Sequence, residues 1–339
     1  MKKIKVGIVG LGRLGKKHAE NIAFRVPGAE LMAACSIITE EVEWVRRNWG
    51  IKYGYTNFYD MLQNKELDAI VIASSSGEHC KQIEAALDAG FHVFCEKPLG
   101  ISIEECKTAE KAVEKHPAKV FMLGFMRRYD PSYAYAKQKI DEGYIGEPYI
   151  IKATSIDPES AIQGVLKYAA SSGGIFMDMA VHDIDLIRWY FGDIELDSVY
   201  ASGRGFLHKE FEKYEDGDNA CAMMTFKDGY IAMLHAGRTA PHGYHIETEI
   251  IGTKGTLRIG AIPEKNLVSI FNEDGMLKEC VSGFLERFEQ AYRLEMEEFI
   301  NCIIEGRKPD ITVYDGTKAT EIAHAATRSF KEKKLITLR

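Results

Sequence analysis

The sequence predicts an α/β protein with two domains: a doubly wound parallel sheet at the N-terminus and then an α+β domain with a large, mainly antiparallel open sheet. Three observations predict this arrangement. Over the first third of the chain, short apolar runs alternate with amphipathic segments. A glycine-rich turn, GLGRLG at 10–15, directly follows the first apolar run. After about residue 147, the pattern changes to long stretches in which apolar and polar residues alternate.

The N-terminal domain is expected to contain parallel strands at 5–10, 29–35, 68–74, 92–97 and 119–125. These runs are short, apolar and rich in β-branched residues, as buried parallel strands are. Charged amphipathic segments, such as EHCKQIEAALDAG at 78–90, lie between them and predict the crossover helices. This alternation is typical of βαβ units with helices on both faces of the sheet.

The C-terminal domain is expected to begin with a strand near 149–156 and a helix within GGIFMDMAVHDIDLIRWYFG at 173–192. In ACAMMTFKDGYIAMLHAGR at 220–238, Asp228 and Gly229 suit the tight turn of a hairpin. Further strands are predicted at 244–251, 255–259 and 267–271, and helices at 285–305 and 314–333. We therefore expect domains at 1–125 and 126–339, and we allow for the final helix to pack back on the first domain.

Composition and charge exclude several classes of function. With 46% hydrophobic and 27% charged residues, the chain has the composition of a soluble globular protein. Its net charge of −7 offers no basic stripe for a phosphate backbone, so no nucleic-acid partner is expected. No run of about 18 apolar residues is present, so no membrane partner is expected either. The seven cysteines are scattered without a CxxC pair, which predicts a reduced, cytoplasmic protein with no structural zinc.

The glycine-rich turn predicts a dinucleotide-binding site and makes the N-terminal domain a Rossmann domain. Gly10 allows a tight turn, Gly12 lets the backbone approach a pyrophosphate, and Gly15 lets the helix pack closely on the strand. The first helix offers its N–H groups and its positive dipole end to the phosphates. This glycine spacing also occurs by chance in turns, but here the strand, the helix and the second strand follow in the expected order.

The second strand ends without the acidic residue that usually binds the adenosine ribose of NAD. Ser36 occupies that place. A serine can hydrogen-bond to the ribose hydroxyl but does not repel the 2′-phosphate of NADP, and Arg13 could attract that phosphate. The charge pattern therefore leaves both NAD and NADP open.

Lys97 is a candidate residue for chemistry, because it lies in EKP at 96–98 at the end of a predicted strand. The carboxyl ends of strands in open α/β sheets face the ligand crevice, so a lysine there is well placed to meet a cofactor. Pro98 stiffens the turn that aims the side chain. The alternative is a surface lysine paired with Glu96.

Asp178 and His182 are four residues apart in the mostly apolar helix within 173–192. Positions four apart share a helix face, so the carboxylate can accept from one imidazole nitrogen and fix the orientation of the other. Gly173 and Gly174 would let this helix approach a ligand closely. The alternative is a partly buried structural histidine with an aspartate that caps or solvates the helix. In the same helix Asp183 and Asp185 are expected to be surface charges, and Ile184, Leu186, Ile187 and Trp189 are expected to pack.

A dinucleotide turn, a strand-end lysine and an Asp/His pair are the parts needed to handle an alcohol proton while a hydride moves to or from a nicotinamide. With these residues the chain resembles the glucose-fructose oxidoreductase and inositol dehydrogenase family (Gfo/Idh/MocA) over essentially its whole length. The segments that carry the resemblance are GLGRLG at 10–15, EKPLG at 96–100, GFMRRYD at 124–130 and GGIFMDMAVHDIDLIRW at 173–189. GFMRRYD is similar to the segment seen in myo-inositol and scyllo-inositol 2-dehydrogenases.

The resemblance implies NAD(P)-dependent oxidation of a ring secondary alcohol, most closely that of an inositol and with NAD preferred, by a dimer or homotetramer assembled through the C-terminal sheet. It implies that Lys97, Asp178 and His182 are catalytic. It also implies polyol contacts from Arg127, from Asp157 in SIDP and from Tyr244 in HGYHIE. The residues expected to contact the cofactor are Gly10, Gly12, Arg13, Leu14, Gly15, Ser36, Ser74, Ser75, His79, Glu96 and Lys97. Ser36 and SSSGEH at 74–79 depart from the family pattern, which has an acid and a Thr-Pro turn at these places.

Two other functions stay open at this point. The same chemistry on another sugar or sugar derivative is the nearer one, because pocket residues rather than the fold decide the substrate. A dinucleotide-binding regulator without turnover belongs to a different class. The presence of Lys97, Asp178 and His182 argues against it, since a sensor needs no acid/base groups.

Overall fold

The computed structural model describes residues 3–192, 194–261 and 263–338, and the chain forms two compact units. Unit 1 comprises Met1–Tyr129 and Gln290–Thr320, and unit 2 comprises Asp130–Glu289 and Glu321–Arg339. The sequence prediction placed one boundary after residue 125 and allowed only the final helix to return. In the structure Gln290–Thr320 belongs with the N-terminal part, because apolar residues of this segment fill the core of unit 1.

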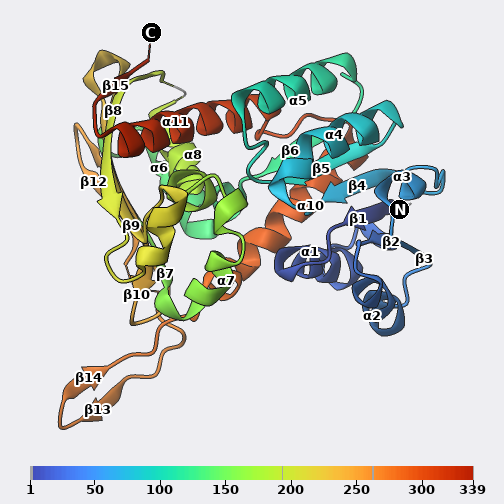
Figure 1. Cartoon of the computed structure of the whole chain (residues 1–339), viewed down its shortest axis with the longest axis horizontal. Coiled ribbons are helices and arrows are strands. Elements are labelled where there is room, and N and C mark those ends of the chain that lie inside the picture. The colour runs from blue at the N-terminus through green and yellow to red at the C-terminus, as the bar shows by residue number, and fades with distance from the viewer. Residues whose placement is uncertain (1–2, 193, 262, 339) are drawn as a thin grey trace. The chain divides into compact units, whose positions relative to one another are not determined.

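Unit 1 contains a six-stranded sheet in the order β3-β2-β1-β4-β5-β6, and each of its pairs is parallel (Figure 1). This is the predicted doubly wound order. Its strands are β1 (Ile4–Val9), β2 (Ala29–Cys35), β3 (Tyr53–Tyr55), β4 (Ala69–Ile72), β5 (His92–Glu96) and β6 (Phe121–Gly124). Its helices are α1 (Arg13–Phe24), α2 (Thr39–Trp49), α3 (Phe58–Met61), α4 (His79–Asp88), α5 (Ile103–Lys115) and α10 (Glu289–Glu305). The five predicted strands are confirmed, whereas β3 was missed because three residues are too few for a periodic signal.

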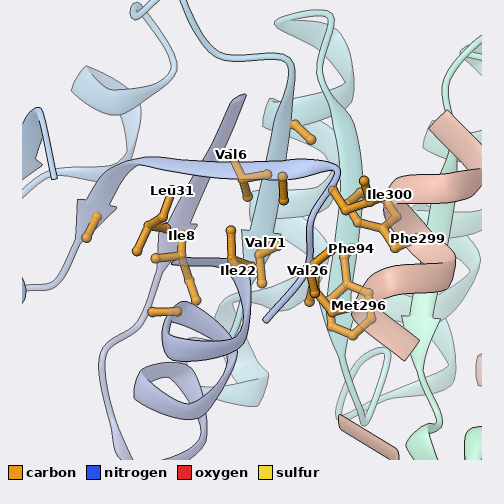
Figure 2. Packing of buried hydrophobic residues seen from close by; sticks show 14 of the residues in the cluster. Val6, Ile8, Ile22, Val26, Leu31, Val71, Phe94, Met296, Phe299 and Ile300 are labelled. Atoms are coloured by element: carbon orange, nitrogen blue, oxygen red, sulfur yellow. The ribbon is translucent and has the colours of Figure 1, made fainter. Parts of the chain in front are cut away.

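The core of unit 1 forms because its strands are apolar on both faces. The four consecutive residues of β4, Ala69 to Ile72, point alternately to the two faces and have no exposed surface. Figure 2 shows Met296 and Phe299 of α10 in the same cluster, beside Phe94 of β5. A late segment of the chain thus completes the core of the N-terminal sheet.

Unit 2 contains a seven-stranded sheet in the order β12-β11-β7-β10-β9-β8-β15. The β7·β10 pair is parallel and the other pairs are antiparallel, which confirms the predicted mainly antiparallel sheet. Its strands are β7 (Pro148–Pro158), β8 (Leu196–Arg204), β9 (Asn219–Phe226), β10 (Ile231–Ala240), β11 (His245–Gly252), β12 (Thr256–Ala261) and β15 (Ile336–Thr337). Its helices are α6 (Pro131–Asp141), α7 (Ile162–Leu166), α8 (Val181–Phe191) and α9 (Phe284–Arg287), with the end of α11 (Val313–Glu332).

The hairpin predicted at Asp228 and Gly229 joins β9 to β10. Both residues have a positive φ, 62° and 84°, as a tight hairpin turn requires. The strand predicted at 267–271 is wrong in its extent and its sheet. Instead, β13 (Ile270–Asn272) pairs with β14 (Gly275–Leu277) in a separate hairpin that projects from the sheet of unit 2 (Figure 1).

Two further features concern the described residues as a whole. In the ranges that the structure describes, no helix combines the length and the apolar character needed to cross a bilayer. All seven cysteines are free thiols.

Candidate active site

The turn between β1 and α1 is crowded at Gly10 and Gly15, as the sequence predicted, and open at Gly12. Gly10 has a φ of +89°, and a Cβ there would lie 2.3 Å from the Ala73 carbonyl oxygen. A Cβ on Gly15 would lie 1.9 Å from the Gly10 carbonyl oxygen, so helix and strand pack too closely for a side chain. At Gly12, by contrast, no described atom lies within 4 Å of the position a Cβ would take. Beside the first N–H groups of α1 there is therefore open space of the kind that a pyrophosphate fills.

Ser36 directly follows β2, but its hydroxyl is turned inward. Only 6% of the residue is exposed. Its Oγ donates to Glu41 Oε2 at 2.7 Å and accepts from the Ile38 amide at 3.2 Å. Sequence reasoning did not single out Glu41, because acids in the first turn of a helix are common for reasons of the helix dipole alone.

The segment after β4 holds Ser74, Ser75 and His79, which were predicted to contact the cofactor. Ser75 is exposed, whereas Ser74 Oγ donates to Gln82 Oε1 at 2.7 Å. His79 is buried, with Nδ1 2.7 Å from the Pro98 carbonyl oxygen and Nε2 3.2 Å from the Ser74 carbonyl oxygen. Burial lowers the pKa of His79, and a neutral ring can donate only one of these two bonds at a time. His79 thereby ties the end of β4 to the turn after Lys97.

Lys97 follows β5 and is partly buried. The Glu96 carboxylate accepts from the Lys97 backbone amide at 3.1 Å through Oε2. Its other oxygen accepts from His18 Nε2 at 2.6 Å, and Glu96 is 4% exposed. The sequence offered Glu96 as a cofactor contact or as a surface partner of Lys97. In the structure its carboxylate faces the interior of unit 1, where it fixes the backbone that carries Lys97.

Glu295 of α10 completes a buried cluster with His18 and Glu96. Glu295 Oε1 lies 4.0 Å from His18 Nε2, and both residues are 0% exposed. Burial, together with the nearby Glu96, raises the pKa of Glu295 well above its usual range. The ligand atoms of the three side chains lie within 4.8 Å of one another. A shared metal ion would hold its nitrogen and oxygen ligands about 3 Å apart or more. His18 and Glu96 are 2.6 Å apart, so they form a charge-assisted hydrogen bond instead.

The helix predicted within 173–192 consists of two successive segments. Gly173 and Gly174 have positive φ values of 77° and 86°; Phe176–Ala180 then forms a π-helical turn, and α8 follows it. π-helical turns are frequent at functional sites, and this one carries Asp178 in the turn before His182. His182 is 8% exposed. That Asp178 orients His182 stays a prediction.

Asp178 is held by a buried arginine that sequence reasoning missed. Arg238 of β10 is 1% exposed, and its Nη2 donates to Asp178 Oδ2 at 3.4 Å. The Tyr168 hydroxyl donates to the same oxygen at 3.4 Å. Arg238 Nη1 donates to Asp216 Oδ2 at 2.9 Å, while Asp216 Oδ1 accepts from the Ile175 amide at 2.9 Å. The guanidinium thus fixes both Asp178 and, through Asp216, the backbone that enters the π turn.

The prediction that Asp183 and Asp185 are surface charges is wrong, because they are 0% and 1% exposed. Ser155 Oγ donates to Asp183 Oδ2 at 2.7 Å. Nearly every residue of α8 is buried, and the helix packs against β7. Polar side chains of this helix are therefore buried along with its apolar ones. Ile184, Leu186 and Ile187 are buried, as predicted.

The three predicted polyol contacts lie at the ends of secondary-structure elements. Arg127 follows β6 in the short helix η2 (Met126–Tyr129) and is 3% exposed. Asp157 lies near the end of β7 and is partly exposed. Tyr244 precedes β11, is 3% exposed and donates its amide to the Val281 carbonyl oxygen at 3.0 Å. Their contacts with a substrate stay predictions.

Comparison with known proteins decides the family. Residues 4–125 match the oxidoreductase family with an NAD-binding Rossmann fold, and residues 133–258 match the GFO/IDH/MocA C-terminal domain. The chain belongs to the Gfo/Idh/MocA oxidoreductase family. The NAD-binding domain that the glycine pattern predicted is thereby confirmed.

Several Gfo/Idh/MocA proteins resemble this chain over nearly its full length. The scyllo-inositol 2-dehydrogenase (NAD(+)) of Bacillus subtilis (strain 168) is 36% identical over 328 residues, which are 97% of this chain and 94% of the relative. The scyllo-inositol dehydrogenase from Lactobacillus casei, solved with bound cofactor NAD(H) and scyllo-inositol, has a TM-score of 0.96 at 45% identity over 99% of each chain. The myo-inositol 2-dehydrogenase from Lactobacillus plantarum has a TM-score of 0.97 at 38% identity over 100% of each chain.

We expect Glu295→Gln to gain stability relative to the wild type as the pH rises. Below about pH 4.3, the usual pKa of glutamate, the Glu295 proton is bound in the folded and the unfolded chain alike. Above that pH the unfolded chain releases the proton first, because folding raises the pKa of Glu295. The free energy of unfolding of the wild type then falls by up to about 1.4 kcal/mol per pH unit until the folded pKa is passed.

Urea unfolding between pH 5 and pH 8 measures this difference. Glutamine has no proton to lose, so the two stability curves should diverge in favour of the variant. Glu297→Gln is the matched control, because Glu297 lies on the same helix with its side chain 34% exposed. Parallel curves for Glu295→Gln and the wild type would contradict the raised pKa.

For Arg238, we expect removal of the cation to destabilise the fold and a change of its geometry to impair turnover. Arg238→Met leaves two aspartates without their buried cation and should cost about 3–5 kcal/mol in unfolding free energy. Arg238→Lys keeps the charge but loses the planar fork, so kcat should fall about tenfold or more while KM for NAD stays within about threefold. Arg204→Lys, with 58% of its side chain exposed on the same sheet, is the control and should change neither quantity. A normal kcat in Arg238→Lys would reject the positioning role.

Proposed function

We propose that this chain is an NAD-dependent inositol dehydrogenase, which oxidises one ring secondary alcohol of myo- or scyllo-inositol to the ketone. One observation supports this above the others. The likeness to inositol dehydrogenases covers 97–100% of this chain and includes a relative solved with both NAD(H) and scyllo-inositol. The residue types needed for the chemistry are all present as well.

The turn between β1 and α1 fits a dinucleotide. The space beside Gly12 and the first N–H groups of α1 suit a pyrophosphate. When bound, NAD⁺ supplies the hydride acceptor. The side chains of this protein must then remove the hydroxyl proton, stabilise the charge that develops on the oxygen and hold the ring in place.

Lys97, Asp178 and His182 meet these needs in our proposal. His182 takes the hydroxyl proton as general base, oriented by Asp178. Lys97 stays a cation and stabilises the developing alkoxide. Arg127, Asp157 and Tyr244 would orient the other hydroxyl groups of the ring.

Two further arrangements support the catalytic roles. Asp178 is anchored by Arg238 and by the Tyr168 hydroxyl, so its position does not depend on a single flexible bond. The backbone amide of Lys97 is anchored by the buried Glu96 carboxylate. Pre-organised groups of this kind raise kcat because they need no rearrangement in the transition state.

Steady-state assays test the proposal. Formation of reduced nicotinamide is followed by absorbance with scyllo-inositol, myo-inositol and glucose, each with NAD and with NADP. We expect kcat/KM for an inositol to exceed that for glucose by about tenfold or more. Turnover of glucose alone would favour another sugar as substrate, and dinucleotide binding without any turnover would favour a regulator.

We also propose a homo-oligomer, a dimer or tetramer, assembled through the open face of the unit 2 sheet. One exposed row crosses this face in register, with an apolar half and a charged half: Tyr200, Met223, Met233, Lys152, Glu249 and Arg258. The three apolar members are 38–53% exposed. A face with both halves can meet a copy of itself about a two-fold axis. The molar mass in solution, measured by light scattering, gives the number of chains in the oligomer.

A cytoplasmic location completes the proposal. All seven cysteines are free thiols, and four of those in unit 1 have their thiol pKa raised chiefly by burial. Buried, protonated thiols suit a reducing compartment and play no part in the proposed chemistry. The expected partner is the small polyol, with no nucleic acid and no membrane.

We expect Lys97→Met to lower kcat by about a hundredfold or more while cofactor binding stays within about tenfold. The reason is that a pre-organised cation acts mainly on the charge that develops in the transition state. Lys107→Met, an exposed lysine of α5, is the control and should leave kcat unchanged. Turnover of Lys97→Met within a few-fold of the wild type would reject the role.

For His182 and Asp178, we expect the losses in kcat to be strongly non-additive. His182→Ala and Asp178→Asn should each lower kcat strongly, and the double variant should be barely worse than His182→Ala, since an orienting group matters only when the base is present. Additive losses would mean independent roles. A lowered melting temperature with near-normal activity of the folded fraction would mean that the histidine is only structural.

A further inference from the structure

The end of β2 raises the question of what recognises the adenosine ribose. Ser36 stands where NAD-binding Rossmann domains usually have an acid. In the structure its hydroxyl proton is already donated to Glu41 Oε2 at 2.7 Å, and only 6% of the residue is exposed. The serine therefore has no proton left for a ribose hydroxyl, and it carries no charge to reject a 2′-phosphate.

Glu41 brings a carboxylate to the same place from the neighbouring helix. It lies in the first turn of α2, with its side chain 21% exposed. Its Oε1 is 3.9 Å from Lys16 Nζ, which is within ion-pair range but too far for a hydrogen bond. Among the described residues, this oxygen still has room to accept from a ligand.

Four contacts locate this carboxylate within unit 1. It is bonded to Ser36 after β2, and it faces Lys16 of α1. The Lys16 amide closes the first turn of α1 on the Gly12 carbonyl oxygen at 3.0 Å. The Gly10 amide, in turn, donates to the Cys35 carbonyl oxygen at 2.9 Å, which joins the glycine turn to the end of β2. Glu41 thus lies between the strand end that meets the ribose and the helix that meets the pyrophosphate.

We propose that Glu41, held by Ser36, is the residue that binds the adenosine ribose of NAD and discriminates against NADP. The carboxylate accepts from the ribose 2′-hydroxyl in a charge-assisted hydrogen bond. It repels the 2′-phosphate of NADP, and it offsets the positive charge of Lys16, which would otherwise attract that phosphate. The inference rests on the proposed NAD-dependent function and names the group that sets its cofactor choice.

Binding of NADH and NADPH without any polyol tests the proposal. Nicotinamide fluorescence gives the Kd of each cofactor for the wild type and the variants. Glu41→Gln should weaken the binding of NADH and tighten the binding of NADPH. The ratio of the Kd for NADPH to the Kd for NADH should therefore fall by about tenfold or more, or about 1.4 kcal/mol. Ser36→Ala should shift the ratio in the same direction by about two- to fivefold, because Glu41 then loses one of its anchors.

Two further variants separate this role from bulk charge and from misfolding. Glu40→Gln removes the adjacent acid, which is exposed, and should leave the ratio within twofold. Glu41→Asp keeps the charge and should retain discrimination better than Glu41→Gln. An unchanged ratio in Glu41→Gln, or an equal change in Glu40→Gln, would overturn the role of Glu41 alone. Failure of the wild type to bind either cofactor would overturn the NAD-dependent function itself.

Discussion

The arrangement of unit 2 around Asp178 depends on one buried cation. Arg238 is 1% exposed, yet it carries a full charge in the sheet. Burial opposes that charge, but Asp216 and Asp178 together raise the pKa of Arg238 above its usual value. The three groups therefore require one another, since an unpaired charge at this depth would destabilise the fold by several kcal/mol. The same bonds that neutralise the arginine set the position of Asp178 and the path of the chain into the π turn.

Unit 1 uses a related device at Lys97. Glu96 points inward to His18, and its second oxygen holds the Lys97 amide. The 0% exposed Glu295 lies beside this pair and favours its protonated form, so the cluster does not accumulate two buried negative charges. In each unit, a buried group with no expected contact to the substrate holds the backbone or side chain of a proposed catalytic residue. The sequence offered Glu96 as a cofactor contact or as a surface partner of Lys97, whereas in the structure its buried carboxylate holds the Lys97 backbone amide.

Local signals were enough to predict the fold and most of the proposed site. The roles of Gly10 and Gly15 follow from one turn, and the Asp228–Gly229 hairpin follows from two residues. The residues that were missed or misjudged have partners that lie far away in the sequence. Nothing in the amphipathic pattern of α10 distinguishes Glu295 from a solvated acid, and Arg238 lies 60 positions from Asp178 in a strand whose alternation is ordinary. Asp183 was misjudged for the same reason, because its partner Ser155 lies 28 positions earlier on a strand under the helix.

In our proposal, the end of β2 has lost the usual acidic residue, and Glu41 supplies the negative charge in its place. A Rossmann domain that selects NAD uses a carboxylate near the ribose 2′-hydroxyl, and that carboxylate can come from more than one position in the chain. With Ser36 at the strand end, a carboxylate must come from elsewhere, and the first turn of α2 is near enough for Glu41 to reach the serine hydroxyl. There its charge is favoured by the positive end of the helix dipole and by Lys16 at 3.9 Å. The rule that expects an acid about 20 residues after the glycines fails at Ser36, because it considers only one position in the sequence. Binding of the ribose depends instead on where a carboxylate lies in the folded protein.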